Sequence, residues 1–333
     1  MKTTRTRARR GGLAALVAGI FLTALSAAIC GAAPASSALA GGAPAPARAF
    51  SAPPTLAPGH PQRVPSAGGV PTVPGDVGGV GDWEHAWEVV GLLRAEPPQG
   101  RMVYYLGDST ARESLVSEAS WNEQLRQLGA DGVRAYALAG HGQTFAMDAR
   151  LIRALPHSRG LALIGVSLSR FIGPPVRGPA APVVELPPGT VPQLSPWRQH
   201  LFDGRPVMTG AQKQGRVVHW RRARTPAFLR YRAANLRALG KLIAVCKAHG
   251  LRPVLVELPL NVAVVGHQLD RQRASLRAGC AAVAAEHDVR FLPFQLARRL
   301  PSTGFFDICH LVEAGYTKWQ AGLSKWVIKL LPR

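Results

Sequence analysis

A serine that directly follows an apolar run is the first residue of this sequence that could act as a nucleophile. Ser109 ends the run MVYYLGDS and precedes a segment of helical character, so its backbone N–H is expected at a helix N-terminus. A hydroxyl placed there could attack a carbonyl carbon while the N–H stabilises the negative charge that forms on the carbonyl oxygen. The alternative is an N-cap without chemistry, because serine is favoured at that position.

The partners that such a serine needs lie together near the C-terminal end of the sequence. Asp307 and His310 are three residues apart in FFDICHLVEAGY, which we expect at the start of the last helix. At that separation the carboxylate can accept the imidazole Nδ1–H and orient the ring to take a proton from Ser109. An isolated Asp-x-x-His is a weak pattern. It becomes informative here because Gly-Asp-Ser follows the first core strand and Asp-x-x-His precedes the last helix of the same domain.

Further basic residues are candidates for substrate binding. Arg170 follows an apolar strand and could bind a carboxylate or phosphate of the substrate, with a structural salt bridge as the alternative. His141 could line the pocket. The cluster HWRRAR (219–224) could form a patch for an anionic substrate, or it could be a solvated helix face.

The cysteines and the metal motifs complete the search for chemistry. We expect Cys309 to face away from Asp307 and His310 and to serve packing. Cys246 and Cys280 lie on candidate helices on either side of one strand, and spacing leaves open whether they form a disulfide. The sequence contains no CxxC, no HExxH and no His/Asp/Glu cluster with ligand spacing, so it predicts neither a metal nor a cofactor. Nor does it contain the Gly-x-Ser-x-Gly elbow of α/β-hydrolases.

The elements that position these residues alternate between strands and helices from about Asp82 onward. Strands are predicted at 102–107, 133–139, 161–168, 253–260 and 289–294. Helices are predicted at 83–93, 111–128, 144–155, a long run up to His249, 268–287 and 316–331. This alternation predicts an α/β fold, a three-layer sandwich with a mostly parallel central sheet flanked by helices. In such a sheet, sites form at the C-terminal ends of the strands, where Ser109 lies.

The chain divides into three regions by composition. Residues 1–40 combine a basic start with the apolar run LAALVAGIFLTALSAAICGAA and read as an export signal, either cleaved after Ala40 or kept as a membrane anchor. Residues 41–80 are rich in Pro, Ala and Gly and are predicted to be a disordered linker. Residues 81–333 suit one domain, in which the Pro-rich stretch 173–226 is predicted to be an irregular cap near the site.

The net charge is strongly positive. Removing residues 1–40 takes away five basic residues and no acidic one, which lowers the formal charge from +21 to +16. A basic exported protein is expected to attract anionic wall polymers, acidic polysaccharides or a phospholipid surface, and not nucleic acid. An Arg-rich composition imposed by a GC-rich genome is the alternative explanation.

The motifs, in this order, resemble the SGNH (GDSL-type) hydrolase superfamily over about residues 100–330. GDST (107–110) resembles its first block and DICH (307–310) its last, which implies a flavodoxin-like fold with Ser109 as nucleophile, His310 as base and Asp307 as orienting acid. The resemblance also implies an oxyanion hole made by Ser109, by Ala139 or Gly140 in LAGHGQT, and by Ser167, which stands where the family has an asparagine. More loosely, the blocks resemble an extracytoplasmic branch of O-acyltransferases.

Three functions follow from these observations. The first is an exported serine esterase that removes a small acyl group from a glycan or lipid. The second is an O-acyltransferase that uses the same Ser-His-Asp set to acylate a cell-envelope polymer. The third is a non-catalytic module that binds an anionic wall polymer. The oligomeric state is left open.

Overall fold

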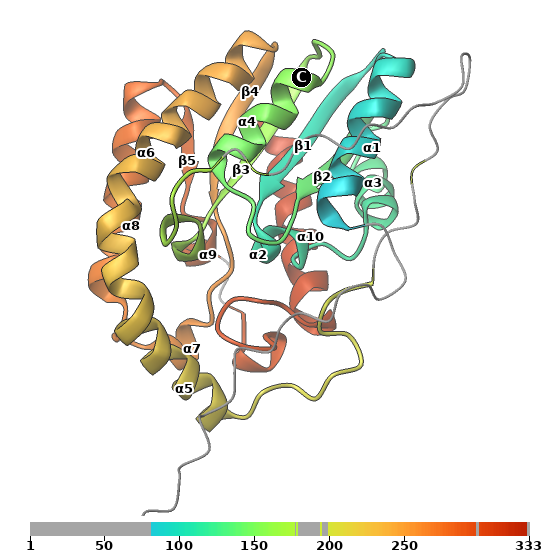
Figure 1. Cartoon of the computed structure of the whole chain (residues 1–333). Helices are drawn as coiled ribbons and strands as arrows, with labels where there is room; N and C mark the ends of the chain where they lie inside the picture. Colours follow the sequence, from blue (N-terminus) through green and yellow to red (C-terminus); the bar gives the residue numbers. More distant parts are fainter. Residues whose placement is uncertain (1–80, 177, 179–193, 195–198, 298–299, 332–333) are drawn as a thin grey trace, which may run out of the picture. The chain divides into compact units, whose positions relative to one another are not determined.

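The computed structural model describes residues 81–176, 178, 194, 199–297 and 300–331 (Figure 1). All of them belong to one compact unit, Gly68–Arg333. The expected export signal (1–40) and linker (41–80) lie outside the described residues and stay predictions. Within the described part of the chain, no helix has both the length and the apolar character needed to cross a bilayer.

A five-stranded parallel sheet forms the centre of the domain. The strands are β1 (Arg101–Gly107), β2 (Val133–Ala139), β3 (Gly160–Val166), β4 (Leu251–Glu257) and β5 (Arg290–Leu292). Their spatial order is β2-β1-β3-β4-β5, and every pairing is parallel. The α/β sandwich with a mostly parallel sheet is therefore confirmed.

The direction of the chain reverses beside β1. From β1 the chain moves to one side to form β2 and then crosses to the other side of β1 to form β3. In open parallel sheets this reversal leaves a crevice at the C-terminal ends of the two central strands, and ligands bind there. Ser109 follows β1 and Ser167 follows β3, so both lie at this position.

Helices cover both faces of the sheet because each strand alternates its side chains between two hydrophobic cores. One core contains Tyr104 of β1 and packs under α1 (Asp82–Ala95), α4 (Phe145–Ala154), α6 (Thr225–Ala248) and α8 (Asp270–Glu286). The other contains Tyr105 and packs under α3 (Glu118–Gln127) and α10 (Glu313–Leu330). The strands are buried on both faces, which explains why they read as continuous apolar runs.

One predicted helix is interrupted. The helix expected at 111–128 is divided into α2 (Ser109–Arg112) and α3, with a turn between them. Ser117 starts α3 as its N-cap, because its hydroxyl accepts the N–H of Ser120. The break leaves the four residues of α2 as a separate turn that carries Ser109.

The stretch 173–226, predicted to be an irregular cap, is helical in its last part. Helix α5 (Gly210–His219) continues through the π-helical turn η2 (Trp220–Arg224) into α6. A capping box formed by Thr209 and Gln212 starts α5. The short elements α7 (Val262–Val265), α9 (Phe294–Ala297), η1 (Leu168–Phe171) and η3 (Ser302–Gly304) lie in loops after the strands and before α10.

Candidate active site

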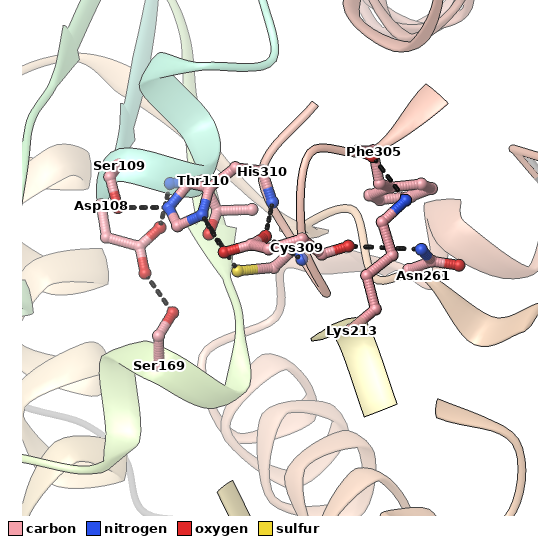
Figure 2. Close-up of polar contacts among 10 residues, drawn as sticks. Asp108, Ser109, Thr110, Ser169, Lys213, Asn261, Phe305, Cys309 and His310 are labelled. Atoms are coloured by element: carbon pink, nitrogen blue, oxygen red, sulfur yellow. Dashed lines mark hydrogen bonds and ion pairs between the residues drawn. The ribbon is translucent and has the colours of Figure 1, made fainter. Parts of the chain in front are cut away.

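Ser109 begins α2 directly beyond the C-terminal end of β1 (Figure 2). Asp108 is the N-cap, and its Oδ1 accepts the N–H of Thr110 at 3.1 Å. The hydroxyl oxygen of Ser109 lies 3.0 Å from Nε2 of His310, although the two residues are 201 positions apart in the sequence. Because α2 is only one turn long, its helix dipole is small and contributes little to stabilising negative charge at Ser109, contrary to the expectation from the sequence.

His310 is oriented by Asp307. Nδ1 of His310 lies 2.9 Å from Oδ2 of Asp307, a distance at which the ring donates its Nδ1–H to the carboxylate. That tautomer leaves Nε2 with a lone pair directed at the hydroxyl of Ser109. The structure thus brings together the three residues that the sequence placed in one site.

Asp307 and His310 lie in a turn rather than in the last helix, since α10 begins at Glu313. The second carboxylate oxygen of Asp307 accepts the backbone N–H groups of Cys309 and His310, both at 2.9 Å. The carboxylate therefore closes the turn and orients the imidazole at the same time.

Two buried residues that the sequence analysis missed hold this turn in place. Lys213 of α5 donates to the carbonyl oxygens of Ser302 and Phe305 at 2.9 and 2.8 Å. Asn261 donates to the hydroxyl of Ser302 and to the carbonyl of Asp307. The capping pattern at 209–212 was a signal for α5, and the four-residue spacing from Lys213 to buried Val217 would have placed Lys213 on its inner face.

The pKa values of the Asp–His pair are shifted in opposite directions. Burial by itself lowers the pKa of His310, but the neighbouring Cys309 and Asp307 more than offset this and raise it well above its ordinary value. Burial raises the pKa of the Asp307 carboxyl. The charge of the imidazolium and the hydrogen bonds from Cys309 and His310 lower the pKa by more than burial raises it, so the net pKa lies far below the usual range. The raised pKa favours the imidazolium, and His310 acts as a base only in its neutral form.

Gly140, predicted as an oxyanion donor, is not available as one. Its N–H donates to the carbonyl oxygen of Gly107 at 3.2 Å, and the next N–H, of His141, donates to Asp82 at 3.1 Å. These bonds tie the loop after β2 to β1 and α1. No hydrogen bond of the Ser109 N–H is found within the described part of the chain, so this group stays the candidate oxyanion donor.

Ser167 does not aim its hydroxyl at an oxyanion position, contrary to expectation. The hydroxyl donates to Oδ2 of Asp108 at 3.0 Å and lies 2.7 Å from the hydroxyl of Ser169, which also donates to Asp108. A side chain shorter than asparagine is thus drawn back to the N-cap of α2. Asp108 and Ser169, which the sequence analysis did not single out, connect the turn after β3 to the start of α2.

Arg170, predicted to bind substrate, forms the structural salt bridge that was the alternative. Its side chain is fully buried, pairs with Asp148 at 2.6 Å and donates to the carbonyl of Gly165 at 2.7 Å. Gln143 donates to the same carboxylate at 2.6 Å, and the guanidinium lies over the ring of Phe145. This network joins the segments that follow β2 and β3.

Replacing Arg170 by alanine should lower the free energy of unfolding by about 3–5 kcal/mol, because it leaves the Asp148 carboxylate buried without its partner. Urea unfolding of the two proteins measures the difference. Arg153→Ala, which removes an exposed arginine of α4, should change the stability by no more than about 0.5 kcal/mol. A cost below about 1 kcal/mol for Arg170→Ala would show that the pair does not stabilise this loop network.

His141 is exposed and does not line the pocket beside His310, so its predicted contact with substrate has no support in the fold.

The prediction that Cys309 faces away from Asp307 and His310 is wrong. Its sulfur lies 3.7 Å from Nδ1 of His310, because Asp307 closes a turn there instead of a helix. Cys246 and Cys280 are buried free thiols, without the disulfide that the spacing left open.

Asp307, Cys309 and His310 are also the one group among the described residues whose ligand atoms could share a metal ion, since they lie within 4.8 Å of one another. The nearest ring nitrogen of His310 already donates to Asp307. A metal ion on this set would have to displace that hydrogen bond.

Part of the cap covers one side of His310. The ring of Phe202 stacks on Phe306 with centroids 4.1 Å apart and lies 5.0 Å from the ring of His310. The neighbouring His200 anchors this segment through Nδ1 to the buried carboxylate of Glu113 at 2.9 Å. An aromatic ring beside an imidazolium is favourable and also limits the access of water to it.

A pocket of about 220 Å³ opens on the other side of the turn that carries His310. Its walls come from the segments after β3 and β4, from the helical run through α5 and η2, from α8 and from residues 307–310. The volume exceeds that of a cavity of roughly 150 Å³, which holds benzene. It is therefore large enough for a short acyl chain or part of an alcohol.

Neither a protein-family model nor a curated protein sequence matches the chain. Several solved structures do. TesA matches with a TM-score of 0.42 and 15% identity, over 69% of this chain and 100% of its own. Axe2, an acetylxylan esterase from Geobacillus stearothermophilus, matches with a TM-score of 0.44 and 12% identity, over 68% of this chain and 94% of its own.

A lipolytic protein of the G-D-S-L family from Veillonella parvula matches with a TM-score of 0.39 and 14% identity, over 70% of this chain and 100% of its own. A GDSL-like lipase, an acetylxylan esterase and a lipolytic protein of the G-D-S-L family are thus among the solved structures that this chain resembles.

Proposed function

We propose that this protein is an exported serine esterase that removes a small acyl group from a glycan or lipid. The observation that carries the proposal is the continuous chain of hydrogen bonds from Ser109 through His310 to Asp307, with distances of 3.0 and 2.9 Å. A binding protein needs no such relay. The export signal expected from the sequence at residues 1–40 supports a site of action outside the cytoplasm.

In the first half of the reaction, neutral His310 accepts the hydroxyl proton of Ser109 on Nε2 while the serine oxygen bonds to the ester carbonyl carbon. Asp307 stabilises the imidazolium that forms. The N–H of Ser109 donates to the oxyanion. When the intermediate collapses, the carbon–oxygen bond to the alcohol breaks, and His310 returns its proton to the departing alkoxide.

In the second half, His310 takes a proton from water, and the resulting hydroxide oxygen bonds to the acyl carbon. The bond to Ser109 then breaks, Ser109 regains its proton from His310, and the carboxylic acid leaves. With Gly140 and Ser167 committed to other partners, the oxyanion receives fewer donors than expected, and each missing donor costs about 2.7–4 kcal/mol of transition-state stabilisation. Modest turnover is therefore expected.

Covalent labelling tests the proposal. The full-length protein is treated with a fluorophosphonate probe, and intact mass measures the stoichiometry while peptide mapping locates the adduct. We expect one adduct per chain, on Ser109, together with hydrolysis of 4-nitrophenyl acetate and butyrate. Hydrolysis with an adduct on another residue would refute the role of Ser109. A folded protein that neither reacts nor hydrolyses would favour the polyanion-binding module instead.

The O-acyltransferase alternative uses the same acyl-enzyme, and the aromatic cover of His310 by Phe202 is the observation that favours it. The two activities differ in whether water or another hydroxyl accepts the acyl group. Adding a glycan alcohol to the 4-nitrophenyl acetate assay distinguishes them, because a transferase converts the alcohol to its acetate ester in place of releasing acetate. An anionic envelope polymer is the acceptor that the basic composition suggests.

A further inference from the structure

The pocket beside His310 has apolar walls and a basic side. Leu168, Ile172, Leu260 and Leu276 contribute to the walls. Asp307, Cys309 and His310 also line the pocket, and Ser109 contacts this His310 from outside the lining. Arg216, His219 and Arg224 line it from the helical run. Arg216 is half-buried and Arg224 is exposed. The apolar walls therefore limit the access of water mainly at Arg216, where they strengthen the attraction between the guanidinium and a bound anion relative to an open surface.

Neither Arg216 nor Arg224 forms an ion pair with an acidic residue in the part of the chain that the structure describes. The acidic residues that line the pocket are each paired. Glu257 binds Arg277 at 2.8 Å, and Asp307 binds His310. Arg273 of α8 also lines the pocket and pairs with Asp270 at 3.2 Å. Among the described residues, the surplus positive charge of the pocket therefore lies on Arg216 and Arg224.

The π-helical turn places these arginines on the side of the helix that lines the pocket. Pro226 has no N–H to donate to the carbonyl four residues before it, so the helix widens, and the N–H of Thr225 donates to Trp220, five residues back. Arg216, Trp220 and Arg224 follow at intervals of four residues and line the pocket. Arg221, Arg222 and Arg224 are all exposed, and of these three only Arg224 lines the pocket. Single π-helical turns of this kind are frequent at functional sites.

We propose that this pocket selects ester substrates that carry a negatively charged group, a carboxylate or phosphate, held by Arg216 and Arg224. The inference rests on the proposed ester cleavage at Ser109 and names the class of substrate. Glu257 is already paired with Arg277, so the acidic group of the substrate is held by Arg216 and Arg224 while its apolar part contacts the leucines.

Matched ester pairs test the charge preference in the full-length protein. On the acyl half, mono-4-nitrophenyl adipate is compared with its methyl ester. On the alcohol half, 4-acetoxybenzoate is compared with methyl 4-acetoxybenzoate. We expect kcat/KM to favour the anionic member of one pair by about tenfold or more, the effect of one hydrogen-bonded charge pair. The pair that shows the preference identifies which half of the substrate enters the pocket.

Variants then assign the preference to the pocket. In the double variant Arg216→Gln/Arg224→Gln, the ratio of anionic to neutral kcat/KM should fall to near one. The control Arg221→Gln/Arg222→Gln makes the same change in net charge on the same helical run and should keep the wild-type ratio. Equal rates for both members of both pairs in the wild type would overturn the proposal, as would an equal loss of preference in the control.

A binding measurement separates this inference from the proposed function. Monomethyl adipate and dimethyl adipate are titrated into the full-length protein by calorimetry. If the wild type cleaves no ester but binds the monoanion more tightly, and Arg216→Gln/Arg224→Gln loses that difference, the pocket assignment stands and the esterase proposal falls. If the protein cleaves esters and neither assay shows a charge preference, the esterase proposal stands and the pocket assignment falls.

Discussion

Replacing Ser109 by alanine should lower kcat/KM for 4-nitrophenyl acetate by about 10⁴-fold or more, because residues of such a set act as a unit. The variant keeps the backbone N–H that would hold the oxyanion and loses the oxygen that would form the acyl-enzyme. The hydroxyl of Ser109 lies 3.0 Å from His310, so its removal also leaves Nε2 without a proton to accept. Steady-state rates corrected for spontaneous hydrolysis measure the effect.

Ser158→Ala is the matched control for this change. Ser158 precedes β3 at the opposite end of the sheet, where its hydroxyl lies 3.5 Å from that of Tyr104, and its loss should leave the rate as in the wild type. Circular dichroism of both variants establishes that the fold is retained. If Ser109→Ala kept more than about a tenth of the wild-type rate, another nucleophile would have to be sought.

Replacing Asp307 by asparagine should lower kcat by about 10⁴-fold, the effect of losing the carboxylate that sets the tautomer of a catalytic histidine. An asparagine amide donates where the carboxylate accepts, so Nδ1 would lose its proton and Nε2 would carry one. The ring could then not accept the proton of Ser109. The variant also loses the negative charge that stabilises the imidazolium formed in each half-reaction.

The same substitution should change the pH dependence. In the wild type the pKa of His310 is raised well above its ordinary value, against the effect of burial, by Cys309 and Asp307. Only the neutral ring accepts a proton, so kcat/KM should be low below this pKa and should rise with pH through it. Asp307→Asn removes part of the stabilisation of the imidazolium, which moves the rising limb of the profile to lower pH while the plateau falls.

If Asp307 only stabilised the turn, Asp307→Asn would lower the plateau of the kcat/KM profile without moving its rising limb. The pH at which kcat/KM rises therefore distinguishes this role from stabilisation of the imidazolium. Asp131→Asn, an exposed residue in the turn before β2, is the control and should change neither. The measurement is kcat/KM for 4-nitrophenyl acetate across the pH range in which the fold is retained. An unmoved limb in Asp307→Asn would contradict the proposed coupling.

Most strands and the proximity of Asp307 to His310 could be predicted from the sequence, although the helix expected at 111–128 is divided and α10 begins only at Glu313. Strands buried on both faces must be apolar throughout, so the runs at 102–107 and 133–139 identified β1 and β2 almost to the residue. Asp307 and His310 are close in the chain, and a turn or a helix equally brings them into contact. Ser109 follows a parallel strand, and such residues meet at one edge of the sheet.

The tertiary structure decided which polar groups of this edge remain available. The N–H of Gly140 is taken by Gly107, the hydroxyl of Ser167 by Asp108, and the guanidinium of Arg170 by Asp148. Each partner lies on another element, so no spacing in the sequence reveals it. A buried donor must find an acceptor, and packing alone determines which one is in reach.

The same reason separates the arginines of the cluster at 219–224, which look alike in the sequence. A proline widens the helix at this turn, and the packing of the helix decides that Arg224 lines the pocket while Arg221 and Arg222 do not, although all three are exposed. Local spacing determines which residues share a helix face. The contacts of that face with strands and loops far away in the chain determine whether it binds, supports or merely covers the site.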